Sequence, residues 1–410
     1  MKYDILETSE ESLTIDVVGG QINSSRNKNI TKKGVRLFEG QKIYTTSFVG
    51  KISDQEILKK AQGTKTVGIN YDYDIPTFEN MKMVDEESLK DPLYKIQETL
   101  ELTQERLARY SNEFVFNGKF ERSYYNTSLK NEAGSILSRS GGGSSWYYLF
   151  KKVGSANLFD GYFEESGRIL DLEDVLDKNI PYLEAYNNLL TFQNGKYPVL
   201  FVDGAKISKL TESLRADKYC EGSALYSGKL NEKILSKDFS LFDINYLPEK
   251  GILRKFDEEG VVRKIAKLPL IENGVLKNVI ADLRNAKKYG VEATGNGRRS
   301  FDSPVGLGFN GLLIGKGSRS TQEILKGLNE CVVVFMASGG DFTDKGDYST
   351  PLQLAYLVKK GEIVGRLPQL TVKTTTEDMF NSRLIEIASD GFQKDKLNPS
   401  VFTEMDVYLN

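Results

Sequence analysis

The alternation of hydrophobic and polar residues predicts that the chain opens with antiparallel strands. Residues 13–17 alternate in this way, and Gly19-Gly20 supplies the positive-φ pair of a tight hairpin turn. Residues 34–38 and 42–48 repeat the alternation on either side of a second turn. The first part of the chain is therefore predicted to be a β-meander.

Capping residues predict two helices after these strands. Ser53 and Glu56 have the spacing of a capping box, which predicts a short helix directly after Ser53. Asp91-Pro92 places a capping carboxylate before a first-turn proline. Apolar residues on one helical face follow, so a longer helix is predicted over residues 93–110.

The following segment is predicted to return to short strands and then to helix. Turn residues interrupt residues 113–140, and Gly141-Gly142-Gly143 indicates a loop or a flexible strand edge. Residues 170–190 have a helical pattern that we expect to break at Pro181. A polar turn at 194–196 marks the predicted end of the first domain.

The second half begins with a buried-strand pattern at residues 197–202, followed by a predicted helix over 205–216. Glu272-Asn273-Gly274 lies between two apolar runs, and Asn-Gly in that setting is a strong hairpin signal. Lys360-Gly361 repeats this arrangement. Strands and helices occur in blocks rather than in strict alternation, which favours the α+β class.

The length of 410 residues exceeds what one hydrophobic core usually serves. We therefore predict two domains, an N-terminal α+β domain over residues 1–193 and a C-terminal, β-rich α+β domain over 194–410. Each is expected to have a mostly antiparallel sheet with packed helices.

The charge pattern argues against nucleic acid and membrane as partners. The chain has 55 basic and 57 acidic residues, interspersed without long basic blocks. It opens without an apolar leader, and its most apolar run, residues 331–337, is far shorter than the ~20 residues of a spanning helix. We expect a cytoplasmic protein.

The chain contains no histidine, which excludes an imidazole base, a Ser-His-Asp triad and an HExxH zinc helix within it. Cys220 and Cys331 are far apart in sequence and are expected to be free, buried thiols. No residue of the chain is assigned as catalytic or as a metal ligand.

Two further patterns have simpler interpretations than a ligand site. Residues 306–311 match GxGxxG, but a strand pattern rather than a helix follows, so these glycines are expected at bends or close backbone contacts. Asp341, Asp344 and Asp347 do not have the spacing of a calcium loop and indicate a polar turn.

Charged residues of the second half offer weak candidates for a site. Asp257-Glu258-Glu259 could supply acid-base carboxylates, although a surface turn closed by Gly260 is the favoured interpretation. Arg298 and Arg299 could bind a carboxylate or a peptide terminus, because guanidinium groups pair well with planar anions. With Asn296, which precedes them, they are the candidate substrate-binding residues.

Residues 256–260, 270–276 and 294–299 together resemble the C-terminal domain of the TldD/PmbA family, also called modulators of DNA gyrase. The resemblance spans nearly the whole chain. Members of this family form a metalloprotease of TldD and TldE (PmbA) subunits. The residues that carry the family motif are Asp257, Gly260, Glu272, Asn273, Gly274 and Gly295.

The resemblance implies a TldE-like subunit. In TldD-type subunits a histidine pair with a glutamate binds zinc, and a cysteine near the C-terminus completes the ligands. The corresponding residues here, about 214–221, contain no histidine, and residues 391–410 contain no cysteine. The C-terminal domain would then be a degenerate metallopeptidase domain without its own cofactor, and zinc is expected in a TldD-like partner subunit.

The predicted function is that of a non-catalytic subunit of a peptidase that processes extended peptides, which bind by main-chain pairing to strand edges. The main alternative is a stand-alone peptide-binding or regulatory protein that has lost protease activity. A gyrase or nucleic-acid effector is opposed by the near-neutral charge. An autonomous enzyme that uses Asp257 or Asp344 lacks a carboxylate pair with a suitable spacing.

Overall fold

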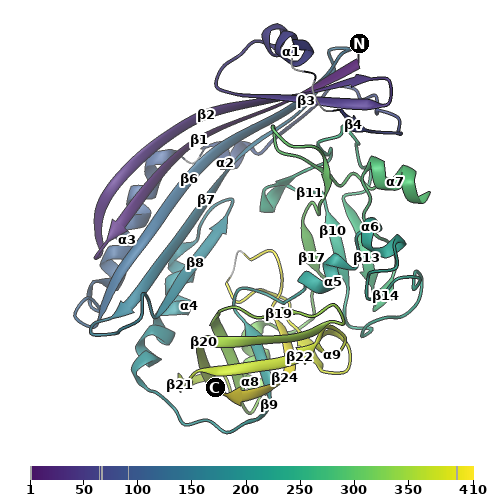
Figure 1. Ribbon diagram of the computed structural model, residues 1–410. Helices are drawn as coiled ribbons and strands as arrows, with labels where there is room; N and C mark the ends of the chain where they lie inside the picture. Colours follow the sequence, from purple (N-terminus) through teal and green to yellow (C-terminus); the bar gives the residue numbers. More distant parts are fainter. Residues whose placement is uncertain (1, 64, 66–67, 91, 394–395) are drawn as a thin grey trace.

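The structure is a computed structural model that describes residues 2–63, 65, 68–90, 92–393 and 396–410. It has the predicted α+β fold. A long, curved sheet from the first part of the chain arches over two sheets from the second part (Figure 1). None of the described helices combines the length and the apolar character needed to cross a membrane.

The long sheet has the strand order β4-β3-β2-β1-β6-β7-β5, with β8 also paired to β7. Its strands are β1 (Lys2–Val18), β2 (Gln21–Glu39), β3 (Lys42–Val49), β4 (Ile69–Asn70), β5 (Met81–Val84), β6 (Phe114–Asn131), β7 (Ile136–Lys152) and β8 (Gly161–Gly167). All neighbours are antiparallel except β5 and β7. The predicted turn is confirmed, with φ of 58° at Gly19 and 76° at Gly20.

The strands β1 and β2 are much longer than the alternation predicted. β2 has 19 residues, and residues 21–27 are exposed on both faces of the sheet. A strand with polar residues on both faces has no hydrophobic period to detect. Its main chain is nevertheless paired with β1 along the strand, apart from a register shift between Asp16 and Val17.

The interpretation of Gly141-Gly142-Gly143 as a loop was wrong, because these residues lie inside β7. The backbone N–H of Gly142 donates to Oγ of Ser88, at 2.7 Å. A Cβ at Gly142 would lie 2.9 Å from the carbonyl oxygen of Ser88. These glycines therefore allow the segment that contains α2 (Glu86–Lys90) to approach the strand.

The helices agree with the predictions in part. The capping box is confirmed, since the N–H groups of Ser53 and Glu56 bond each other's side chains at 3.1 and 3.2 Å. The proposed cap at Asp91 lies outside the described residues. The predicted break at Pro181 was wrong. The helices of the first part are α1 (Asp54–Gly63), α2, η1 (Leu93–Lys95), α3 (Ile96–Ala108), α4 (Leu172–Glu184) and η2 (Ala185–Asn187).

The helix α4 continues through Pro181, which lies three residues before its last residue, Glu184. The ring fits helical φ but removes one main-chain hydrogen bond. Leu176, Ile180 and Leu183 of α4 are buried, and this burial offsets the loss.

The second part contains two main sheets, with the orders β14-β13-β10-β17 and β18-β9-β24-β22-β20-β19. Their strands are β9 (Gly195–Phe201), β10 (Leu241–Ile244), β13 (Lys267–Glu272), β14 (Val275–Leu276), β17 (Leu312–Ile314), β18 (Cys331–Ala337), β19 (Asp341–Phe342), β20 (Asp347–Lys359), β22 (Leu370–Thr375) and β24 (Val401–Leu409), with β21 (Glu362–Arg366) and β23 (Leu384–Ile387) attached to the larger sheet. Both predicted hairpins are confirmed, with positive φ at Asn273-Gly274 and Lys360-Gly361.

Short elements complete the second part, and the predicted helix over 205–216 is replaced by two shorter ones, α5 and α6. These elements are β11 (Tyr246–Leu247), β12 (Ile252–Leu253), β15 (Gly297–Arg298), β16 (Gly306–Leu307), α5 (Ser208–Glu212), α6 (Ala216–Cys220), η3 (Pro248–Lys250), α7 (Leu283–Tyr289), α8 (Thr321–Gly327) and α9 (Thr376–Phe380).

The two parts of the chain share hydrophobic cores. One cluster joins Trp146 of β7 and residues of α4 to Val333 and Tyr356 of the larger C-terminal sheet. A smaller cluster joins Phe256 to Leu129 and other residues of the long sheet. Because both clusters draw on both parts, the domain boundary near residue 193 stays a prediction.

Candidate functional site

The segment Phe256–Gly260 lies at the junction of the long sheet and the second part of the chain. It was predicted to be a surface turn, and that interpretation was wrong. The residues Asp257, Glu258 and Glu259 are exposed by only 0%, 4% and 2%. Gly260 has φ of +91°, and a Cβ there would lie 2.8 Å from the ring of Phe78. The turn therefore requires glycine and brings three carboxyl groups into the interior.

The carboxylate of Asp257 holds the turn together. Its Oδ1 accepts from the N–H groups of Glu259 and Val261, at 3.0 and 2.9 Å. Its Oδ2 accepts from the N–H of Gly297, at 2.9 Å. This residue thus connects the turn to residues 294–299, which the sequence motif had grouped with it.

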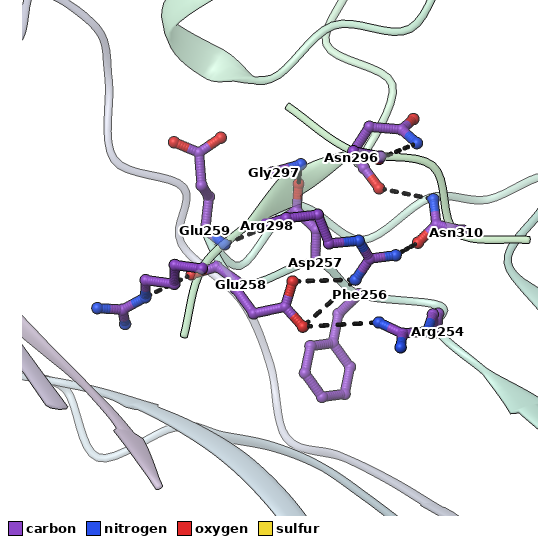
Figure 2. Close-up of polar contacts among 12 residues, drawn as sticks. Arg254, Phe256, Asp257, Glu258, Glu259, Asn296, Gly297, Arg298 and Asn310 are labelled. Carbon is purple, nitrogen blue, oxygen red and sulfur yellow. Dashed lines mark hydrogen bonds and ion pairs between the residues drawn. The ribbon is translucent and has the colours of Figure 1, made fainter. Parts of the chain in front are cut away.

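Glu258 lies among three guanidinium groups, and Figure 2 shows two of them, those of Arg298 and Arg254. Its carboxylate is 2.5 Å from Nη2 of Arg139, 2.9 Å from Nη1 of Arg298 and 3.9 Å from Nη1 of Arg254. Burial acts to raise the pKa of Glu258, but the charges of Arg139 and Arg298 outweigh it and hold the pKa below its ordinary value. Since Arg139 belongs to β7, this ion pair joins the two parts of the chain.

The three guanidinium groups share a single carboxylate, that of Glu258. Burial, together with the charges of Arg298 and Arg139, lowers the pKa of Arg254 to about 10. Its guanidinium still remains charged at neutral pH. The cluster around Glu258 therefore carries more positive than negative charge.

Glu259 points to the opposite side of the turn (Figure 2). Its Oε2 accepts from the N–H of Leu283 at 2.9 Å, at the start of α7. Its Oε1 is buried without a hydrogen-bond partner among the described residues. Burial and the charge of Asp257 raise the pKa of Glu259 to about 8, so we expect this carboxyl to be protonated at neutral pH.

The pKa of Asp257 is raised less than that of Glu259. Burial raises it to about 6, while the three backbone N–H donors act in the opposite direction. At neutral pH the turn is thus expected to contain an ionised Asp257 beside a neutral Glu259.

A second ion cluster is formed by Asp4, Arg36 and Arg299. Arg36 pairs with Asp4, and Nη2 of Arg299 lies 2.7 Å from Oδ1 of Asp4. Nε of Arg299 also donates to the carbonyl oxygen of Glu258, at 3.2 Å. Although burial acts to raise it, the pKa of Asp4 is held below its ordinary value by the charges of Arg299 and Arg36. The cluster attaches β1 and β2 to the same turn.

Asp243 is the centre of a third cluster and is fully buried. Its Oδ2 accepts from Arg263, Asn296 and Asn310, at 2.7, 2.9 and 3.0 Å. Its Oδ1 accepts from the N–H of Asn310, at 2.7 Å. Arg298 also bonds the side chain of Asn310, so this cluster continues into the one around Glu258.

The candidate substrate-binding residues are placed together, but most of their polar groups already have partners. Asn296 is fully buried, and the side chain of Arg299 is exposed by only 1%. Arg298 is the most accessible of the three, with 19% of its side chain exposed. Substrate binding by these residues stays a prediction.

The other motif residues have local backbone roles. Gly295 has φ of +68°, and its carbonyl oxygen accepts from Asn310. Glu272, Asn273 and Gly274 form the β13–β14 turn. A Cβ at Gly274 would lie 2.3 Å from the carbonyl oxygen of Leu235, which explains the glycine.

The GxGxxG match at residues 306–311 is not a nucleotide fingerprint. It joins β16 to β17, and a strand rather than a helix follows it. A Cβ at Gly308 would lie 2.7 Å from Cγ of Arg298. The interpretation of these glycines as bends and close contacts is confirmed.

The residues at the position of the family's zinc helix do not fit a zinc ion. Cys220 was expected to be buried but is exposed, whereas Cys331 is buried as predicted. Partial burial and the charge of Glu221 raise the pKa of the Cys220 thiol, although zinc binds the thiolate. Asp217 pairs with Arg215, and Glu221 pairs with Lys288, both at 2.9 Å.

More generally, the described residues contain no group of three or more His, Cys, Asp or Glu that could hold a metal ion. The three carboxyl groups of the turn also do not line any of the five main cavities of the described residues. Their arrangement serves to connect the two parts of the chain.

Sequence reasoning missed several residues of this network. They are Asp4, Arg36, Arg139, Asp243, Arg254, Arg263 and Asn310. Arg263 and Asn310 lie close to motif residues in sequence and could have been considered with them. Arg254 lies only four residues before Glu258 and could have been considered too, whereas Asp4, Arg36, Arg139 and Asp243 carried no local signal because their partners are distant in the chain.

Comparison with known proteins identifies the family. The profile of the PmbA/TldA metallopeptidase C-terminal domain matches residues 194–407, which is more than half of the chain. A metalloprotease from Archaeoglobus fulgidus is 25% identical over 399 residues, covering 93% of this chain and 90% of that protein. A protein named metalloprotease TldD homolog, from Buchnera aphidicola, is 29% identical over 57% of this chain, which corresponds to 47% of its own length.

Solved structures share the fold. TldE from Thermococcus kodakarensis superimposes with a TM-score of 0.85 at 18% identity, covering 100% of this chain and 97% of that one. A protein described as a modulator of a DNA gyrase, from Thermotoga maritima, gives a TM-score of 0.78 at 20% identity, covering 99% and 96%. The profile match confirms the resemblance seen in the motifs, and the chain belongs to the TldD/PmbA family, whose PmbA/TldA metallopeptidase C-terminal domain it contains.

Proposed function

We propose that this chain is the non-catalytic, TldE-like subunit of a TldD/TldE-type zinc metallopeptidase that processes extended peptides. The observation that carries the proposal is that a member of this family contains no histidine. The residues at the position of the zinc helix are ion-paired or carry a raised pKa, as described above. Zinc and the catalytic groups would then belong to a TldD-like partner, in the cytoplasm.

A free strand edge supports a role in holding extended peptides. β2 pairs with β3 only between Lys32 and Glu39 among the described residues. The N–H of Gly50 donates to the carbonyl oxygen of Thr31, so the main-chain groups of Thr31 face β3. Every second residue before Thr31 directs its N–H and C=O groups to this same edge of β2, where β3 is no longer present. Asn29 and Asn27 therefore present main-chain groups that an extended peptide can pair with.

A cavity beside the long sheet offers further space for a peptide. It has a volume of about 510 Å³ and lies where residues 166–169, the end of β9 and residues 396–400 meet. Its wall includes the charged residues Arg168, Asp203 and Lys250 and the apolar residue Phe392. Such a mixed wall suits a chain segment better than one small apolar ligand.

The experiment is to purify this chain alone and after co-expression with a TldD-like protein of its source, and to measure zinc content and peptide hydrolysis for each. We expect that only the complex binds zinc and cuts peptides. Hydrolysis by the chain alone would contradict the proposal. If no complex forms but the chain binds extended peptides, the alternative of a stand-alone peptide-binding protein would replace it.

A further inference from the structure

We propose that a groove between the β3–β4 end of the long sheet and α7 binds acidic peptide segments that carry aromatic side chains. The groove has a volume of about 920 Å³. It is lined by Glu39, Gly40, Gln41, Lys42, Tyr44, Asn70, Tyr71, Asp72, Tyr73, Arg284, Lys287 and Lys288. The inference concerns residues of this chain alone and does not depend on the proposed partner subunit.

Unpaired positive charge is the first observation. Lys42, Arg284 and Lys287 form no ion pair with any described residue, and Lys42 comes from a different part of the chain than the other two. Lys288 is paired with Glu221. Exposed cations gathered in one groove repel one another, and an acidic ligand would relieve this repulsion.

The carboxylates of the groove offset only part of this charge. Glu39 is engaged by Lys65, with 2.6 Å between Oε2 and Nζ. Asp72 is exposed and forms no ion pair among the described residues. The groove therefore keeps a positive balance within a chain whose net charge is only −2.

A platform of tyrosines is the second observation. Tyr44, Tyr71 and Tyr73 line the groove and are half-buried. The rings of Tyr71 and Tyr73 meet edge to face, with centroids 5.4 Å apart, and Phe38 supports Tyr71 at 5.6 Å. Rings fixed in this way offer apolar faces to an aromatic side chain at little entropic cost.

The state of Tyr73 fits the same ligand. Burial raises the pKa of Tyr73 above its ordinary value, and its hydroxyl is neutral at physiological pH. Its hydroxyl interacts with the buried carboxyl group of Glu259, so the groove receives the ring of Tyr73 rather than its hydroxyl. The platform therefore adds no negative charge that would repel an acidic peptide.

The shape of the groove favours a peptide over a phosphate-bearing ligand. The groove runs beside β4, the edge strand of the long sheet, and Asn70 of β4 lines it. Two backbone N–H groups at the start of α7 already have hydrogen-bond partners. The side chain of Asp282 accepts from the N–H of Asn285 at 2.8 Å, and the side chain of Glu259 accepts from the N–H of Leu283. Side-chain cations attract either ligand, but an edge strand can pair with the main chain of an extended peptide and not with a phosphate group.

The test measures fluorescence anisotropy of a labelled peptide of Glu-Gly-Tyr repeats with the full chain. The test variant carries Lys42→Glu, Arg284→Glu and Lys287→Glu. A charge-matched control carries Lys82→Glu, Lys237→Glu and Lys264→Glu, which are exposed positions outside the groove. We expect roughly tenfold or greater weakening in the test variant and less than about twofold in the control.

A second variant tests the platform without changing charge. Tyr71→Ala is expected to weaken binding about threefold to tenfold, since stacking on one ring is worth roughly 1 kcal/mol. Circular dichroism of each variant verifies that it folds. Equal weakening in the control triple variant, tighter binding of a Lys-Gly-Tyr peptide, or preferred binding of a single-stranded oligonucleotide would overturn the proposal.

Discussion

The two sides of the turn at Phe256–Gly260 form an informative comparison. Glu258 and Glu259 are neighbours in sequence and both are buried, but Glu258 lies among guanidinium groups and Glu259 lies beside another carboxyl group. Burial acts to raise the pKa of both. The surroundings alone determine that one carboxyl is ionised at neutral pH and the other is protonated, so adjacent acids of one motif have different roles.

The largest effect on stability is expected from removing Glu258, the ionised carboxylate of the pair. Glu258→Ala leaves the buried guanidinium group of Arg139 and the partly exposed one of Arg298 without their carboxylate, which costs about 3–5 kcal/mol of unfolding free energy. Urea denaturation at pH 7 measures the loss. The control is Glu10→Ala, which removes a surface pair with Lys28 and should change stability by less than about 0.5 kcal/mol. Equal effects of the two substitutions would contradict the account.

A smaller loss is expected from Asp257→Asn, which preserves the shape of the side chain. The amide can still accept from Glu259 and Val261 but directs an NH₂ group at the N–H of Gly297. We expect a loss of about 2 kcal/mol, the usual effect of one buried donor without an acceptor. A stability equal to that of the wild type would show that the Asp257–Gly297 bond does not hold the turn.

The sequence revealed local features well and this turn poorly. The capping box at Ser53 and the Asn273-Gly274 hairpin were predictable, since their signals lie within a few residues. Burial of Glu258 depends on Arg139, and burial of Arg299 depends on Asp4, which are 119 and 295 residues away. A run of charged residues normally indicates a solvated turn, and no local pattern reveals such distant partners.

Long-range packing also explains the other differences between the predicted and the observed secondary structure. Gly141-Gly142-Gly143 has the composition of a loop, but it lies in β7 because the segment around Ser88 contacts it closely. The polar half of β2 lacks alternation and is a strand because β1 pairs with it. The α+β class was predictable because it follows from the order of the strand and helix patterns along the chain, which can be read without knowing the distant contacts.

Glu259, which is protonated at neutral pH, should make the free energy of unfolding depend on pH. The unfolded chain releases the proton of Glu259 near pH 4.5, and the folded chain keeps it to about pH 8. The unfolded state therefore binds fewer protons between these values, so the unfolding free energy falls as pH rises through this window. The pKa of Asp257, raised from 3.8 to about 6, acts in the same direction.

Glu259→Gln tests this dependence. The amide cannot ionise, so we expect the variant to lose less stability than the wild type between pH 5 and pH 8, by about 3 kcal/mol. Denaturation midpoints at several pH values provide the measurement. Parallel curves for the two proteins would show that Glu259 is ionised throughout the window.

The smallest effect is expected at Arg254, which contacts Glu258 at 3.9 Å and lies near two other guanidinium groups. Arg254→Met relieves repulsion while it removes a weak attraction, so stability should change by less than about 0.5 kcal/mol. Arg139→Met, in contrast, breaks the 2.5 Å pair and should cost about 2 kcal/mol or more. A reversed order would assign the main ion pair to Arg254.

The most direct test of the central claim is peptide hydrolysis by the complex of this chain with a TldD-like partner, assembled with Glu259→Gln in this chain or with the zinc-binding histidines of the partner replaced by alanine. If this chain is the supporting subunit, the Glu259→Gln complex keeps its activity within about twofold and the partner variant loses it. Loss of activity in an intact Glu259→Gln complex would contradict the account and place a catalytic acid in this chain.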